Sequence, residues 1–296
     1  MSKIHAAIVT AENSALGMGH MQRMAAFADF LATNGKFKPT LVVQHQMSNF
    51  LQVPIADTLP TDTNIIIRDM RDSLPDEILA LQKTAPVAAI DDMGEGRKLA
   101  DIAIDLLPHP AHIQNTENYR PEAFIYGFNF INSLKILGDK DIPKTLDFAA
   151  YVGGQGEENM LALLPPELSG ALLTGKGSFA VRNGRVASPI EMPYAKIFAQ
   201  AKVVISHFGI TIYEGALAGA NIVTINPSEY HNSLAELAKP TLGLFNAGLG
   251  KNVELVKNAV RKAVAEPRCT TANPAAMLAA ANKNMRRLEE LVLEIC

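Results

Sequence analysis

The residues with the clearest chemical potential lie near the N-terminus, where Gly17-Met18-Gly19-His20-Met21-Gln22-Arg23 follows an apolar run from Ile4 to Val9. The apolar run predicts a strand, and the residues from His20 onward have the spacing of an amphipathic helix. Glycines let a backbone turn tightly and approach a ligand, and the first N–H groups of a helix attract anions. An imidazole placed there can accept a proton near neutral pH. We therefore interpret His20 as a candidate catalytic base and Gly19 as part of a candidate phosphate-binding turn.

The same motif also fits a purely structural role, in which the glycines make a tight strand-to-helix turn and His20 is a polar cap. It is not the dinucleotide-binding fingerprint, because no third glycine follows at the required spacing.

A second strand–turn–helix pattern lies in the C-terminal half, where the apolar run Val203–Ser206 leads through Gly209 into a helix that carries Glu214. Backbone N–H groups in such a turn can bind a diphosphate, and an acidic residue one helical turn later can accept hydrogen bonds from ribose hydroxyls. Glu214 fits equally well as a partner of the helix dipole.

Other polar positions follow predicted strands. Asp91 and Asp92 end one strand and suit hydrogen bonding to sugar hydroxyls, or capping of a turn, better than chelation of a metal. Gly153 and Gly154 form a glycine turn that could approach a ligand, although turn geometry alone would explain them. No histidine, acidic or cysteine spacing predicts a metal site.

The elements that must position these residues alternate between strand-like and helical patterns, which predicts βαβ units and mostly parallel sheets. Strands are expected at Ile4–Val9, Thr40–Val43, Asn64–Ile67, Val87–Ile90, Ile102–Asp105, Phe148–Val152, Ala171–Thr174, Val203–Ser206 and Ile222–Ile225. Helices are expected at His20–Thr33, Asp76–Lys83, Glu157–Leu164, Tyr194–Ala199, Thr211–Ala218, Ser233–Lys239, Val253–Ala265 and Met277–Ile295. In the first helix, Met21, Met24, Ala25, Ala28 and Leu31 recur at helical spacing and predict a face that packs into the core.

The order of these elements predicts two Rossmann-like α/β domains that face each other across a cleft. We expect an N-terminal domain over residues 1–140, which contains His20, and a C-terminal domain over residues 141–296. The link falls around 138–146, and the closing helix could cross back to the first domain.

The composition limits the possible partners. The chain has 296 residues, of which 48% are hydrophobic and 19% charged, and its net charge is −3. No basic field is expected to hold nucleic acid or anionic lipid. Because no apolar run has the length of a signal or a membrane span, we expect a soluble, cytoplasmic protein without stable membrane insertion. The oligomeric state stays open.

Together and in this order, the motifs resemble the two-domain nucleotide-sugar fold called GT-B. Glycosyltransferases such as the bacterial lipid II enzyme share this fold with the UDP-sugar hydrolase of the pseudaminic-acid pathway. The closer likeness is to the hydrolase, including its relatives described as spore-coat polysaccharide proteins. The matching segments are Gly17 to Arg23, Ile90-Asp91-Asp92 with Ala100 to Asp105, Tyr126 to Phe130, Val152-Gly153-Gly154 with Asn159, and Ser206 to Ala220.

The resemblance implies specific roles. His20 matches the catalytic base and Gly19 the glycine before it. The residues expected to bind the nucleotide and its diphosphate are Gly153, Gly154, Ile190, Met192, Gly209, Ile210, Thr211 and Glu214, of which Ile190 to Met192 match a segment whose backbone reads uracil. The residues expected to bind the sugar are Asp69, Asp91, Asp92 and Asn232.

The resemblance also implies a reaction, which is metal-independent hydrolysis of a UDP-sugar at the anomeric carbon, without a cofactor, in cell-surface polysaccharide biosynthesis. Two segments depart from the pattern of the relatives. Arg68-Asp69-Met70-Arg71-Asp72 keeps only the aspartate of an Asp-His-Tyr-Gly sequence, and Phe208 and Ile210 make the phosphate loop around Gly209 bulkier than is common. Two alternatives therefore stay open. One is a GT-B glycosyltransferase that moves a sugar to a hydroxyl acceptor, and the other is a catalytically inactive protein that binds nucleotide-sugars.

Overall fold

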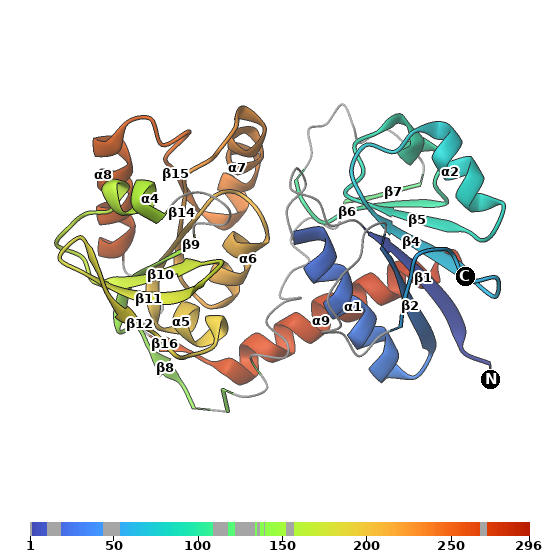
Figure 1. The fold of residues 1–296 in the computed structure, drawn as a ribbon, viewed down its shortest axis with the longest axis horizontal. Coiled ribbons are helices and arrows are strands. Elements are labelled where there is room, and N and C mark those ends of the chain that lie inside the picture. Colours follow the sequence, from blue (N-terminus) through green and yellow to red (C-terminus); the bar gives the residue numbers. More distant parts are fainter. Residues whose placement is uncertain are drawn as a thin grey trace. The chain divides into compact units, whose positions relative to one another are not determined.

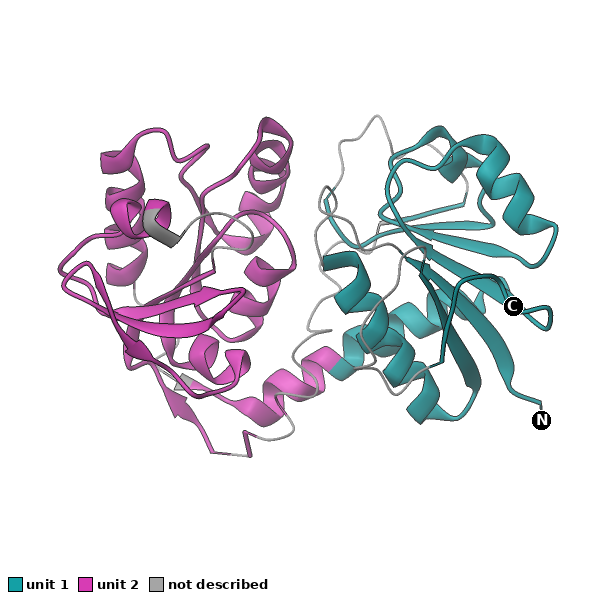
Figure 2. Cartoon of the chain, viewed as in Figure 1, with its two compact units in different colours: residues 1–129, 282–296 teal, residues 130–281 magenta. Residues whose placement is uncertain are grey.

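The computed structural model describes residues 2–10, 19–43, 54–108, 118–121, 134, 137–138, 140–151, 157–266 and 271–296. The chain divides into two compact units (Figure 2). The first unit comprises residues 1–129 and 282–296, and the second comprises residues 130–281.

The first unit is built on a seven-stranded sheet in the order β3-β2-β1-β4-β5-β6-β7, in which all neighbours are parallel (Figure 1). Its strands are β1 (Ile4–Thr10), β2 (Phe37–Val43), β3 (Ile55–Ala56), β4 (Ile65–Asp69), β5 (Val87–Ile90), β6 (Ile102–Asp105) and β7 (Tyr119–Pro121). The strand order reverses between β1 and β4. In open parallel sheets, ligands bind at the carboxyl ends of strands beside such a reversal.

Helix α1 (Gly19–Asn34) follows β1 and packs against β1, β2 and β4. Met21 and Met24 are buried on this face, which confirms the predicted packing surface. Helix α2 (Pro75–Gln82) begins with proline in its first turn, and the Glu77 carboxylate accepts a hydrogen bond from the backbone N–H of Leu74 at 3.0 Å. The short 3-10 helix η1 (Glu95–Lys98) packs against α2.

The second unit has a seven-stranded sheet in the order β12-β11-β10-β9-β13-β14-β15. Its strands are β9 (Leu146–Tyr151), β10 (Gly170–Thr174), β11 (Gly177–Arg182), β12 (Arg185–Pro189), β13 (Ala201–Ser206), β14 (Asn221–Thr224) and β15 (Phe245–Asn246), and β8 (Ile142–Pro143) pairs separately with β16 (Thr271–Ala272). The helices are α4 (Glu157–Leu163), α5 (Tyr194–Gln200), α6 (Ile210–Leu217), α7 (Glu229–Leu242) and α8 (Val253–Ala265). Strands β9, β10, β13, β14 and β15 pair in parallel, and the order reverses between β9 and β13.

The antiparallel hairpin of β11 and β12 was not expected from the sequence. Its turn places Asn183 and Gly184 at φ of +50° and +70°, which these residue types tolerate. Every residue of β12 is exposed, so the strand has no apolar alternation that would have predicted it.

Helix α9 (Pro274–Leu293) belongs to both units, since the division between them falls within it (Figure 2). Leu288, Leu291 and Val292 are fully buried, and the Asn34 amide at the end of α1 donates a hydrogen bond to Glu289 at 3.1 Å. Among the helices that the structure describes, none combines the length and the apolar character required to cross a membrane.

Candidate functional site

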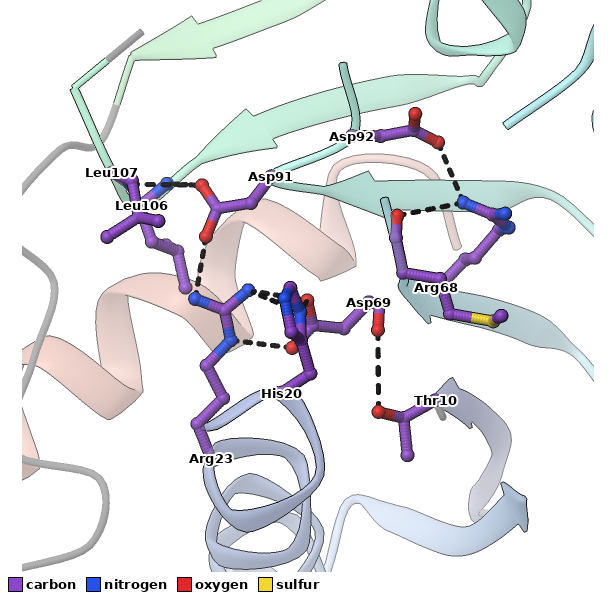
Figure 3. Close-up of polar contacts among 10 residues, drawn as sticks. Thr10, His20, Arg23, Arg68, Asp69, Asp91, Asp92, Leu106 and Leu107 are labelled. Carbon is purple, nitrogen blue, oxygen red and sulfur yellow. Dashed lines mark hydrogen bonds and ion pairs between the residues drawn. The ribbon is translucent and has the colours of Figure 1, made fainter. Parts of the chain in front are cut away.

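His20 lies in the first turn of α1 and is directed toward the end of β4 (Figure 3). Its Nδ1 atom is 2.8 Å from Oδ1 of Asp69, the last residue of β4. Both side chains are buried, and that of Asp69 is completely inaccessible. Because β1 and β4 are the neighbours at which the strand order reverses, the histidine and the carboxylate meet where this fold class binds ligands.

The protonation of Asp69 determines which imidazole nitrogen is available. Burial alone would raise the pKa of Asp69, but the charges of Arg23 and His20 and their hydrogen bonds to the carboxylate lower that pKa below its ordinary value. An ionised carboxylate only accepts hydrogen bonds, so the proton of the neutral imidazole lies on Nδ1. The lone pair of Nε2 is therefore the basic position of His20.

Arg23, one turn after His20 on α1, holds the carboxylate from the other side. Its Nε donates to Oδ2 of Asp69 at 2.6 Å, and its Nη2 donates to Oδ1. Its Nη1 donates to Oδ2 of Asp91 at 2.6 Å. The two carboxylates outweigh the effect of burial and raise the pKa of Arg23, so the guanidinium stays charged.

Asp91 follows β5 and adopts a φ of +48°, in the left-handed region that non-glycine residues rarely occupy. Its Oδ1 accepts hydrogen bonds from the backbone N–H groups of Leu106 and Leu107 at 2.7 and 3.0 Å.

Asp92 is held by a similar set of contacts. Its Oδ2 accepts from Arg68 at 2.8 Å, and its Oδ1 accepts from the backbone N–H groups of Ser73 and Gly94 at 2.9 Å each.

The three aspartates expected to bind a sugar therefore share an unexpected environment. Each is at most 2% exposed, and every carboxylate oxygen of Asp69, Asp91 and Asp92 accepts a hydrogen bond from the protein itself. Their direct role in this arrangement is to position other groups, and contact with a sugar stays a prediction. Sequence reasoning gave no role to Arg23, although a basic residue on the apolar face of a predicted helix was a signal that it pairs with buried acids.

A further buried ion pair lies at the same edge of the sheet. Buried Arg97 pairs with Asp105 at 3.2 Å, next to Tyr119, whose pKa burial and the Asp105 carboxylate raise to about 12. The buried charged groups here are four carboxylates and three guanidiniums, namely Asp69, Asp91, Asp92, Asp105, Arg23, Arg68 and Arg97.

In the second unit, Gly209 is the N-cap of α6, and no side chain caps that helix end. The first N–H groups of a helix have no partner inside it, so they can bind an anion. A Cβ atom added at Gly209 would meet only the His207 ring, at 3.9 Å, so the packing of the protein does not require glycine there. Behind the turn, Asn226 accepts a hydrogen bond from the backbone N–H of Phe208 at 3.0 Å and fixes the loop. The N-terminus of α6 is therefore a helix end without a side-chain cap at the carboxyl end of β13.

Rings gather at the same edge of the second sheet, around the loop after β13. The His207 ring lies 5.9 Å from that of His231, edge to face, and 6.5 Å from that of Tyr151 at the end of β9. Burial lowers the pKa of His207, which keeps the ring neutral at neutral pH. Burial raises the pKa of Tyr151, and the electrostatic effects of Tyr194 and of buried Glu214 raise it further. Sequence reasoning gave His207 no role.

Two other predicted residues have partners within the second unit. Oδ1 of Asn232 accepts a hydrogen bond from Asn246 at 2.8 Å, which leaves its Nδ2 as the group that could face a ligand. The backbone N–H of Ile190 donates a hydrogen bond to the carbonyl of Ser178 at 2.7 Å, so its own carbonyl is the backbone group that could bond to a nucleotide base. Met192 is half-buried. Gly17 and Met18 of the first motif, the Tyr126–Phe130 motif, Gly153 and Gly154 lie outside the described residues. Within the described part of the chain, no group of three or more potential ligands could hold a metal ion.

No protein-family model matches the sequence, and no curated protein matches it either. Solved structures do resemble the fold. A glycosyltransferase of kitacinnamycin is 12% identical over 100% of both chains, with a TM-score of 0.59. MurG of Acinetobacter baumannii is 12% identical over 98% of this chain and 99% of its own, with a TM-score of 0.57. A UDP-GlcNAc 2-epimerase from Neisseria meningitidis, bound to UDP-GlcNAc, is 10% identical over 98% of this chain and 100% of its own, with a TM-score of 0.56.

At these identities the likeness concerns the fold. It confirms the expected α/β class with two parallel-stranded sheets of the GT-B type. The narrower resemblance to the pseudaminic-acid hydrolase finds no support in these structures.

Proposed function

We propose that this protein transfers a sugar from a nucleotide-sugar donor to a hydroxyl acceptor. The observation that carries the proposal is the buried pair of His20 and Asp69, whose atoms lie 2.8 Å apart at the strand reversal of the first sheet. Because Nδ1 is bonded to Asp69, Nε2 is the imidazole nitrogen that can act as a base. Known structures of this fold include glycosyltransferases, which favours transfer over the hydrolysis expected first from the sequence.

In the proposed reaction, Nε2 of His20 removes the proton of the acceptor hydroxyl as its oxygen attacks the anomeric carbon. The bond between that carbon and the diphosphate oxygen breaks, and the nucleoside diphosphate leaves with the bonding electrons. One direct displacement inverts the anomeric centre. The imidazolium that forms is stabilised by ionised Asp69.

The leaving diphosphate is a weak base, so it needs charge stabilisation more than a proton. The turn from Gly209 to Thr211 can provide it through backbone N–H groups and the α6 dipole. Glu214, which is 6% exposed, is the proposed acceptor for ribose hydroxyls. Its burial close to Tyr151 favours a specific partner over a solvated surface role.

A panel of nucleotide-sugars, assayed for nucleotide release with and without hydroxyl acceptors, tests the proposal. Transfer predicts release that depends on the acceptor, whereas release into water alone would show hydrolysis and contradict it. A thermal-shift screen of the same nucleotides locates the donor class, because a ligand present at about 100 times its Kd stabilises the native state by about 2.7 kcal/mol.

Two variants separate the proposed roles. His20→Ala is expected to abolish turnover while leaving the affinity for the nucleoside diphosphate within a few fold. Glu214→Ala is expected to weaken nucleotide binding by about 1–3 kcal/mol, because a charged acceptor is lost. Equal damage to binding from both changes would contradict the division of roles. Tight nucleotide binding without turnover on any donor, unchanged by His20→Ala, would instead indicate a binding protein.

A further inference from the structure

We infer that Arg23 and Asp91 are positioning residues that act on His20 through Asp69. They determine which ring nitrogen carries the proton of the neutral imidazole, and how readily the imidazole takes up a second proton. The catalytic meaning of this inference rests on the proposed function. The series of contacts from Asp91 through Arg23 and Asp69 to His20 does not depend on that function, because all of these contacts lie within the first unit (Figure 3).

The series of contacts begins at the backbone of β6 and of the residues that follow it. Asp91 is fixed by the hydrogen bonds that Leu106 and Leu107 donate to its Oδ1, and by its own N–H, which donates to the carbonyl of Ile104 at 3.0 Å. A left-handed backbone at a non-glycine residue is unfavourable, so the surrounding contacts must hold it. Oδ2 of Asp91 therefore has a defined position relative to β6.

The planar guanidinium of Arg23 transmits that position. One nitrogen is committed to Asp91, and two others donate to the two oxygens of Asp69. A lysine could not replace this geometry, since its ammonium is a single point charge. The plane of the Asp69 carboxylate is thereby fixed, with Oδ1 toward Nδ1 of His20.

The same contacts set a balance of charge around His20. Nη2 of Arg23 lies 3.3 Å from Nδ1 of His20, so its positive charge opposes a second proton on the ring. Asp91 offsets part of that charge from the far side of the guanidinium. Among the described residues, the charged groups that contact the His20 ring are Asp69 of β4 and Arg23 of α1, with Asp91 after β5 behind them.

The protein contains a matched control for Asp91, which is its neighbour Asp92. Asp92 is equally buried at the end of the same strand, also accepts two backbone N–H groups on one oxygen, and also pairs with a buried arginine through the other. Its arginine is Arg68, whose other hydrogen bonds go to the carbonyl of Met70 and to the carboxylate of Glu77. Asp92→Asn therefore removes the same charge from the same edge without interrupting the chain to His20.

The test is a pH titration of the free protein, labelled with 15N-histidine, by two-bond 1H–15N NMR. The method reports the tautomer and the protonation of each of the seven histidines, and His20→Gln assigns the signal. The native protein is expected to show His20 with its proton on Nδ1. Arg23→Gln should raise the pH of half-protonation by about one unit, the size typical of a neighbouring charge. Asp91→Asn should lower the pH of half-protonation of His20 by a smaller amount. Asp92→Asn should leave that pH closest to the value in the native protein.

Several results would overturn the inference. These are a native His20 with its proton on Nε2, shifts of the same sign in Arg23→Gln and Asp91→Asn, or an Asp92→Asn shift as large as that of Asp91→Asn. If Arg23→Gln does not fold, the comparison of Asp91→Asn with Asp92→Asn still decides. Because the titration needs no substrate, the expected shifts in a protein that consumes no donor would refute the proposed function alone. In an active protein, the acid limb of the pH–rate profile should move in the same directions.

Discussion

At the scale of single residues, the first unit contains a buried histidine, His20, that is held by a series of buried charged side chains. A carboxylate behind a histidine holds the ring in one tautomer and stabilises the imidazolium that forms when the ring takes a proton. Here the carboxylate is itself held by a fork of two nitrogens from Arg23, a geometry that only arginine offers. The cost of losing the carboxylate should therefore appear in turnover and not in nucleotide affinity.

Asp69→Asn tests this consequence. An amide can present its NH2 group to Nδ1 and stabilise the wrong tautomer, so kcat is expected to fall by about 1,000- to 10,000-fold. The Kd for the nucleoside diphosphate, measured by calorimetry, should stay within a few fold, and Asp92→Asn is the matched control for removing a buried charge. A loss of kcat smaller than tenfold would contradict the role of Asp69.

Asp69 also links stability to pH. Its pKa is lower in the folded protein than in the unfolded chain, so its contribution is fully present above the unfolded value, about 3.9. That contribution is lost as the pH falls through the lower, folded value. Denaturant unfolding between pH 7 and pH 3 should show the first unit losing stability at the acid end, and Asp69→Asn should lose less over the same range. Exposed Glu290→Gln, on α9, should follow the native curve.

At the scale of elements, the loop after β4 and the helix η1 are packed backbone against backbone. A Cβ atom at Gly96 would lie 2.4 Å from Oγ of Ser73 and 2.6 Å from the carbonyl of Leu74, and the N–H of Gly96 donates to the carbonyl of Ser73 at 2.9 Å. Together with the hydrogen bonds that Ser73 and Gly94 donate to Asp92, this contact anchors Ser73, which directly follows the segment Arg68 to Asp72.

Gly96→Ala is expected to destabilise the protein by about 1–3 kcal/mol, because backbone has to move to admit the methyl group. Gly175→Ala is the control, since a Cβ atom there would meet nothing within 4 Å. Thermal or denaturant unfolding of both variants checks the difference. A Gly96→Ala protein as stable as Gly175→Ala would show that the two segments do not pack this tightly.

The sequence predicted those elements whose signal is local. Buried parallel strands such as β1 and β13 appear as continuous apolar runs, and α1 shows its helical spacing directly. The partners of the aspartates could not be predicted, since Arg23 and Asp91 are 68 positions apart and their pairing depends on the register of three strands. The same limit explains why the hydrogen bonds of Asp69 to Arg23 and His20 were not expected.

At the scale of the whole molecule, α9 makes the first unit discontinuous in sequence. Residues 282–296 are grouped with residues 1–129, and the side chains of Leu288 and Leu291 are fully buried. Leu288→Ala should lower the stability of the first unit by about 2–5 kcal/mol, as is usual for a buried leucine. Hydrogen exchange should then rise in β1 and α1 before it rises in β9 and β13. Glu290→Ala, an exposed neighbour, should change neither, and uniform loss of protection across both units would contradict the grouping.

This discontinuity has a consequence for biosynthesis. As the polypeptide emerges from a ribosome, residues 130–281 leave the exit tunnel before residues 282–296, which complete the first unit. The second unit can therefore reach its native state first, while the first unit still lacks Leu288 and Leu291. A chain that ended at residue 281 would contain every residue of the second unit but not the buried leucines of the first.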